Sequence, residues 1–356
     1  MSSSPFTLFN LPYVPLSIIL NTMNEMQIMK LALTSKRVYR LSKMLRKKRM
    51  ERVSVCIGNY STIRFETTDS IDHTLFRVST LSEIQDDSRI EYLKIEDTVV
   101  QTQKEKDGRG CIHSYFEDIF IGIQTLSEII SDFFSVPIYR LSVTGDRNIN
   151  DPRRAINWIM NRQETIAECS YHSKETSEED LTYFLDTLRV TKSLDVFVKT
   201  SENFQYSFKY PMNLDYLHVQ GRPYPWLTIN NLIETNPRYS WMVETNFTSE
   251  DMRMLLILWI LGWNPNLQTL EFRLKNLDLQ TILNGVPAIY RETPEDLSYK
   301  WSDGEEEPRY FDYFFEIRNV NGAVASIVAD NGPNEFFSLY VWPDRNGQQY
   351  PLERIV

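Results

Sequence analysis

Glycine, histidine and cysteine are scarce in this chain of 356 residues, which contains 12, 4 and 3 of them. The shortage of glycine argues against a glycine-rich nucleotide-binding enzyme, and the motifs GxGxxG, GxxxxGK(S/T), GxSxG and HExxH are all missing. The histidines are spread along the chain without the spacing of metal ligands, at His73, His113, His172 and His218. The sequence therefore predicts a non-catalytic protein with no catalytic residue, no cofactor and no metal ion.

The chain also lacks paired cysteines and membrane signals. Cys56, Cys111 and Cys169 are far apart and odd in number, which excludes a disulfide framework and fits a reducing compartment. No basic segment precedes the first apolar stretch, as a signal peptide requires. The longest apolar run, 255–261, is far shorter than the roughly 20 residues that span a bilayer. We expect an intracellular protein, cytoplasmic or nuclear or both, without a membrane partner.

What is present is a globular composition with an uneven charge. Hydrophobic residues make up 42% and charged residues 24% of the chain, and its length suggests two domains or one elongated domain. The net charge is −10, yet residues 1–60 hold ten basic residues and only two acidic ones. This asymmetry predicts a small basic head joined to a larger acidic body.

The pattern of residues 8–45 predicts that this head consists of three short helices. Pro15 suits the first residue of a helix, and Asn24 with Gln27 forms a capping box for the second. Ser35 is a cap for a third helix, which we expect to continue through Arg52. Three short helices bury little apolar surface alone, so the head is either a docking module or a cap on the body.

In their order, these head residues resemble the F-box. The shared features are a Leu-Pro pair, an apolar first helix, a leucine-bearing second helix, and a small residue followed by basic ones. Pro15 and Val38 depart from the commonest pattern, which has an acidic and an aromatic residue there. The resemblance implies binding to the Skp-type adaptor of cullin–RING ubiquitin ligases. It implies that the following residues form or support that interface: Leu11, Pro12, Leu16, Ile19, Leu20, Ile28 and Leu31.

The basic run Lys43–Arg52 allows two interpretations. It could supply phosphate contacts to a nucleic acid, or it could be a solvated helix face directed at the acidic body or an acidic partner. Apolar residues such as Leu45 and Met50 are interleaved with the basic ones, which favours the second interpretation.

The body contains recurring short segments, most of which fit L-x-x-L-x-(L/I/V), and the last residues of this pattern alternate as in a half-buried strand. They are residues 90–95, 138–143, 194–199, 214–219 and 267–272. Helical patterns precede several of them, and two begin with related capping signals, Thr176 with Glu179 and Thr248 with Asp251. A third helix is expected near 227–234. This alternation favours an irregular α/β solenoid over an ordinary α/β domain with chance leucine pairs.

The C-terminal part predicts an antiparallel β meander. Its strands are expected at 310–319, 322–330 and 335–342. Asn321-Gly322 is a strong hairpin signal, residues 331–333 form the second turn, and an acidic loop at 303–308 comes before the strands. The meander would cover the open end of the solenoid.

An F-box head, the 264–272 segment and a late strand ending in Val341-Trp342-Pro343 together resemble the nematode F-box proteins, whose body is the F-box-associated region. We therefore expect a fold of mixed class, α+β or α/β. It consists of an F-box-like helical docking module (5–50), an irregular leucine-rich-repeat-like body (51–300) and an acidic loop with a β cap (301–356).

This resemblance implies a substrate-recognition adaptor of an SCF-type ubiquitin ligase. Its head would bind the Skp-type adaptor, and through it a cullin, while its body would hold an unknown protein substrate. The alternative is a repeat protein outside any ligase, whose head is only a structural cap. That alternative expects the apolar stripe of the head, Leu16, Ile19 and Leu20, to be buried.

Overall fold

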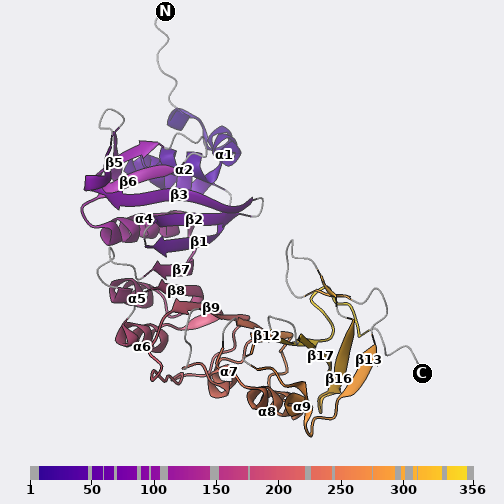
Figure 1. The fold of residues 1–356 in the computed structure, drawn as a ribbon. Helices are drawn as coiled ribbons and strands as arrows, with labels where there is room; N and C mark the ends of the chain where they lie inside the picture. The colour runs from indigo at the N-terminus through magenta and orange to yellow at the C-terminus, as the bar shows by residue number, and fades with distance from the viewer. Residues whose placement is uncertain are drawn as a thin grey trace, which may run out of the picture. The chain divides into compact units, whose positions relative to one another are not determined.

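A computed structural model shows that the chain folds into two compact units, Met1–Ile166 and Ala167–Val356 (Figure 1). The predicted division into 5–50, 51–300 and 301–356 remains a prediction. The structure describes residues 8–46, 50–58, 60–67, 70–85, 90–95, 98–104, 111–144, 152–174, 177–220, 226–242, 245–274, 276–292, 298–300, 308–310, 312–330 and 335–350.

The first unit begins with the predicted helical head. A 3-10 turn, η1 (Leu8–Asn10), precedes α1 (Tyr13–Thr22), α2 (Glu25–Ala32) and α3 (Lys36–Leu45). The capping box of Asn24 and Gln27 is confirmed, and the Ser35 hydroxyl accepts from the Val38 amide as predicted. α1 begins two residues before Pro15, which still lies in the first turn, where a missing N–H leaves no bond unmade.

The third helix is shorter than its sequence pattern predicts. α3 ends at Leu45, and the expected continuation to Arg52 is wrong because strand β1 (Met50–Ile57) begins there. Val53, Val55 and Ile57 are all buried, with polar or half-buried residues between them. This period of two is a strand signal that outweighs the helical pattern of the basic run.

The sheet of the first unit has the strand order β7-β1-β2-β3-β6-β5-β4. β1 pairs in parallel with β7 and β3 with β6, and the other neighbours are antiparallel. The remaining elements are β2 (Ser61–Thr67), β3 (Ser70–Thr80), η2 (Leu81–Glu83), β4 (Glu91–Ile95), β5 (Thr98–Lys104), β6 (Ile112–Phe116), α4 (Ile119–Phe134), β7 (Ile138–Thr144) and α5 (Pro152–Arg162).

Helix α4 covers this sheet and approaches it closely at a glycine. It packs on β1, β2, β3 and β6. A Cβ atom at Gly122 would lie 2.5 Å from the Phe116 ring and 2.8 Å from Val78. Only glycine therefore allows α4 to lie this close to the strands.

The second unit contains a mixed sheet in the order β8-β9-β10-β11-β12-β18-β17-β16-β13. β9 to β12 run parallel, and β12, β18, β17, β16 and β13 are antiparallel neighbours. The strands are β8 (Ile166–Ser173), β9 (Val190–Val198), β10 (Tyr216–Gln220), β11 (Tyr239–Met242), β12 (Thr269–Arg273), β13 (Ile289–Glu292), β16 (Tyr313–Arg318), β17 (Val324–Asp330) and β18 (Phe336–Val341). β14 (Ser298–Tyr299) and β15 (Arg309–Tyr310) form a separate ribbon.

Helices α6 (Glu178–Thr187), α7 (Ile229–Thr235), α8 (Ser249–Ile260) and α9 (Leu279–Leu283) belong to this unit, and α6, α7 and α8 each precede a parallel strand (Figure 1). The capping box of Thr248 and Asp251 is confirmed. α6 instead uses Ser177 as its cap, one residue later than predicted, and Thr176 lies outside the described residues.

The five leucine-patterned segments all contain strands, namely β4, β7, β9, β10 and β12. A helical head followed by a large mixed sheet and a C-terminal meander is therefore confirmed. The leucine-rich-repeat character of the body remains a prediction. The meander of β16, β17 and β18 pairs onto β12 and so extends the sheet. Gly322 has the positive φ of 86° that the Asn321-Gly322 turn requires, whereas 331–333 and 303–307 lie outside the described residues.

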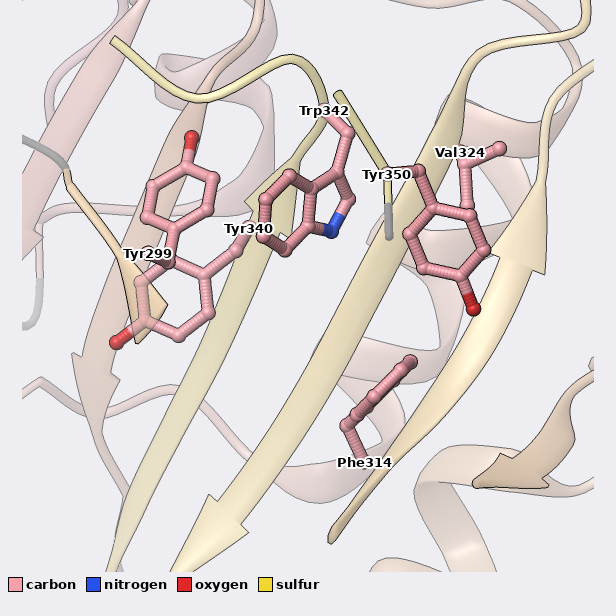
Figure 2. Close-up of a cluster of buried hydrophobic side chains, with 6 residues drawn as sticks. All are labelled: Tyr299, Phe314, Val324, Tyr340, Trp342 and Tyr350. Carbon is pink, nitrogen blue, oxygen red and sulfur yellow. The ribbon is translucent and has the colours of Figure 1, made fainter. Parts of the chain in front are cut away.

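An aromatic cluster covers one face of the meander (Figure 2). Its six buried members are Tyr299, Phe314, Val324, Tyr340, Trp342 and Tyr350. The ring centroids of Tyr299 and Trp342 are 5.1 Å apart, and the Trp342 indole donates to Ser326 Oγ at 3.0 Å. Tyr350 donates to Glu316 Oε2 at 2.7 Å. The cluster thus ties the segments around residues 299 and 342–350 to the sheet.

Among the described helices, none is both long and apolar enough to cross a membrane.

We expect Trp342→Ala to lower the free energy of unfolding by about 3–5 kcal/mol, because it removes a buried ring and leaves a cavity. Urea unfolding followed by tryptophan fluorescence measures the loss. The control is Tyr310→Ala, since Tyr310 is 68% exposed and its loss should change stability by no more than about 0.5 kcal/mol. Equal effects of the two variants would contradict a stabilising role for the cluster.

Candidate docking surface

The first helix of the head has apolar residues on two sides. Leu16 and Leu20 are buried, with 4% and 1% of their surface exposed. Val14 and Ile18, one helical turn apart, are 64% and 62% exposed, and Pro15 and Ile19 lie beside them. We name these last four residues the α1 outer face. A helix that buries one apolar side and exposes another has surface left for a partner.

Side chains of α1 fix it to the end of α3. Ser17 Oγ donates to the Leu45 carbonyl at 3.2 Å, and Asn21 Nδ2 approaches the same oxygen at 3.3 Å. The last carbonyls of a helix have no partner within it, so these bonds complete α3. They also hold α1 in a fixed position on α3.

Helix α3 in turn is held to α4 in the body of the first unit. The Tyr39 hydroxyl donates to Asp132 Oδ2 at 2.7 Å, and Lys43 Nζ lies 2.6 Å from Asp132 Oδ1. The Tyr39 and Phe133 ring centroids are 5.1 Å apart. The hydrogen bond from Lys43 lowers the pKa of Asp132, burial opposes this, and the Tyr39 bond adds to the lowering. The head is therefore a fixed part of its unit.

The contacts of the basic run agree with a structural role for it. Lys43 pairs with Asp132, and the Arg46 guanidinium lies 4.8 Å from the Phe134 ring and donates to the Phe133 carbonyl. Arg52 lies 4.4 Å from the Tyr139 ring. These basic groups contact the protein itself, while residues 47–49 lie outside the described residues.

The seven residues implied by the F-box resemblance do not share one environment. Leu16, Leu20 and Ile28 are buried, Leu11, Ile19 and Leu31 are half-buried, and Pro12 is exposed. Sequence reasoning missed Val14 and Ile18, although the run YVPLSIIL is apolar on every side of the helix and contains the signal. The buried pair Leu16 and Leu20 is what the cap alternative expects, whereas the half-buried Ile19 is not.

A second polar site lies on the sheet of the second unit, where the structure brings two distant histidines together. His172 Nε2 lies 3.1 Å from Asp195 Oδ2, and His218 Nδ1 lies 3.2 Å from Asp195 Oδ1. The His218 ring packs on Trp241 with centroids 4.9 Å apart. Burial by itself raises the pKa of Asp195, but the contacts with both histidines outweigh it and hold the pKa at about 2.

The sequence does not show that these histidines are neighbours, because the leucine pattern implies a different strand register from the one in the sheet. The pattern equates Leu194 with Leu214, whereas in the sheet Leu194 pairs with Leu217. With that register His218 is the neighbour of Asp195.

Within the described part of the chain, no group of three or more His, Cys, Asp or Glu side chains is arranged to hold a metal ion. Cys169 is buried, which raises the pKa of its thiol.

Comparison with protein families finds two matches. The F-box domain matches residues 8–50, which hold α1, α2 and α3, and the F-box associated family matches residues 205–272, which run from before β10 to β12. The chain thus carries an F-box domain and an F-box associated domain, the combination of nematode-type F-box proteins. Both families are typically non-catalytic adaptors. Searches of curated proteins and of solved structures gave no match.

We expect Asp195→Asn to lower the free energy of unfolding by about 2 kcal/mol at pH 7. The folded-state pKa of Asp195 is about 2 against an ordinary value of 3.8, and one pKa unit corresponds to about 1.4 kcal/mol. Because the pKa is depressed, this contribution is present above about pH 4 and is lost as the pH falls toward 2. The difference between variant and wild type should therefore shrink over that window.

Urea unfolding at several pH values measures this difference. Asp312→Asn is the matched control, because Asp312 is exposed on the same unit. A cost for Asp195→Asn that stays constant from pH 7 to pH 2 would show that the carboxylate charge is not what the histidines stabilise.

Proposed function

We propose that this protein is a substrate-recognition adaptor of an SCF-type ubiquitin ligase. The observation that carries the proposal is the exposed apolar α1 outer face within the matched F-box domain. F-box domains generally bind Skp-type adaptors. In this proposal the head binds such an adaptor and through it a cullin, while the second unit, which holds the F-box associated domain, binds a protein substrate.

The α1 outer face has the chemistry of a helix that docks into an apolar groove. Val14 and Ile18 lie one helical turn apart, and burying the part of each side chain that is still exposed contributes about 1–2 kcal/mol. Such paired anchors carry much of the affinity of a helix-in-groove interface. The partner we propose therefore presents a hydrophobic groove to α1.

The other residues implied by the F-box resemblance have supporting places in this proposal. Pro12 and the half-buried Leu11, Ile19 and Leu31 are accessible enough to touch a partner. Leu16, Leu20 and Ile28 are buried and would support the interface indirectly, by holding the helices in position.

The ligase function we propose needs no chemistry from this chain. An adaptor that holds a substrate near the ubiquitin-transferring subunits raises its effective concentration there. The protein would then work inside the cell, in the cytoplasm, the nucleus or both, where such ligases act.

The alternative, a head that only caps the body, is favoured by the burial of Leu16 and Leu20 and by the contacts of α3 with α4. It differs in what it expects of the α1 outer face. A structural cap has no use for exposed valine and isoleucine side chains, so changing them should affect nothing but solubility.

We expect the double variant Val14→Glu, Ile18→Glu to reduce binding to a Skp-type adaptor at least 100-fold while the chain stays folded. Two carboxylates would have to enter an apolar groove without partners, which costs several kcal/mol. Titration of the purified adaptor against the full chain, followed by calorimetry, measures this loss. Tight binding by the double variant, or failure of the wild type to bind, would overturn the proposal.

Two further variants separate docking from folding. Val99→Glu places the same charge on β5, where Val99 is 59% exposed, and should leave adaptor binding unchanged. Leu20→Ala removes a buried side chain and should lower the free energy of unfolding by about 2–5 kcal/mol. If Leu20→Ala destabilises the chain, the double variant stays folded and the wild type does not bind the adaptor, the cap alternative is correct.

A further inference from the structure

The sheet of the second unit has one face that the chain covers only in part. Along β9 and β10, Leu194, Val196 and Leu217 are buried, while the residues between them are half-buried. The aromatic cluster around Tyr340 and Trp342 covers the meander (Figure 2). A pocket lies on the neighbouring parallel strands.

This pocket has a volume of about 260 Å³ and combines aromatic walls with acidic groups. Its main lining residues are Asp195, Tyr216, His218, Tyr239, Trp241 and Glu271. Asp195 and Glu271 are its two acidic residues; Asp195 faces His172 and His218, and the Arg309 guanidinium lies 3.8 Å from Glu271 Oε1. All but Asp195 lie within the F-box associated match at 205–272. The strand register places Asp195, His218, Trp241 and Glu271 side by side in one row.

The chain itself shows that this surface accepts a cation. The Arg345 guanidinium lies 5.0 Å from the Tyr239 ring centre and 5.7 Å from that of Tyr216, and it donates to the Tyr216 hydroxyl. These distances are within the range of cation–π attraction. Arg345 belongs to the segment that covers the meander, and its guanidinium lies against the neighbouring Tyr216 and Tyr239 rings. In the next row, a second guanidinium of this chain, that of Arg309, lies 3.8 Å from Glu271 Oε1.

We propose that the pocket beside Trp241 binds a lysine or arginine side chain of a substrate protein. The proposal rests on the adaptor function above and names the chemistry that its second unit recognises. The indole face of Trp241 attracts a cation more strongly than any other side-chain ring. Glu271, beside Trp241 on the neighbouring strand, supplies an opposite charge that already attracts Arg309, and Asp195 supplies another beyond His218.

The hydrogen-bonding state of the pocket fits a donor-rich ligand. Asp195 Oδ1 lines the pocket and can only accept; it is buried and forms no hydrogen bond with the described residues, although His218 Nδ1 lies 3.2 Å away. His218 Nε2 is likewise buried without a hydrogen-bond partner among the described residues. Ammonium and guanidinium groups carry donors and no acceptors, whereas an anionic ligand would meet two carboxylates.

The test is a titration of the full chain, labelled with ¹⁵N at tryptophan and histidine, followed by NMR. The probes are the peptide acetyl-Gly-Arg-Gly-amide and its citrulline analogue, which has nearly the same shape without the charge. The second pair contains lysine and norleucine. We expect the arginine or the lysine peptide to shift the Trp241 and His218 signals with a Kd at least tenfold lower than that of its neutral partner. Equal binding of charged and neutral peptides would overturn the proposal.

Variants locate the binding. Trp241→Leu removes the aromatic face and Glu271→Gln removes a charge, and each should weaken the charged peptide at least fivefold. Trp241→Phe keeps a ring and should stay within threefold of wild type, which guards against loss by misfolding. Tyr290→Ala and Glu292→Gln change exposed residues on β13 and serve as matched controls. A response that is the same in the Trp241→Leu chain, read from His218, would place binding elsewhere.

Failure of this inference is distinct from failure of the proposed function. The double variant at Val14 and Ile18 should bind the arginine or lysine peptide as wild type does. A chain that binds the Skp-type adaptor but discriminates no charged peptide refutes only the pocket. A chain that binds the charged peptide but not the adaptor refutes the ligase function.

Discussion

The contact between α3 and α4 is the constraint on which the proposed use of this protein depends. Asp132 receives both the Tyr39 hydroxyl and the Lys43 ammonium, while the Phe133 ring packs on Tyr39. These bonds are individually modest, because Asp132 is partly exposed and solvent screens its charge. Together with the aromatic contact they fix a helical head that is too small to be stable alone.

Local signals allowed much of the fold to be predicted from the sequence. Capping boxes and alternating leucines identified the head helices, α8 and the strands β9, β10 and β12, since these depend on neighbours in the chain. The predicted end of α3 was wrong because the helical and the strand periodicity overlap between Leu45 and Arg52. Tertiary pairing of β1 with β2 and β7 decides that region, and sequence alone does not contain it.

The candidate sites were harder to predict because they depend on register and on which side of a helix is covered. Leu16 and Val14 are both apolar, and only the packing of the folded head decides that one is buried and the other exposed. The neighbourhood of Asp195 and His218 required Leu194 to pair with Leu217, a shift of three residues from the motif alignment. A shift of that kind exchanges the residues that point to each face of a sheet.

The segment that carries Trp342 and Arg345 has a consequence beyond its contribution to stability. This segment lies over the meander, and its Arg345 contacts the Tyr216 and Tyr239 rings. Its length therefore determines how many strands are accessible to another molecule. Recognition could then change by lengthening or shortening this one segment, while the strands and their order stay the same. The sheet would stay constant, and the length of the covering segment would determine how much of the sheet surface a ligand can contact.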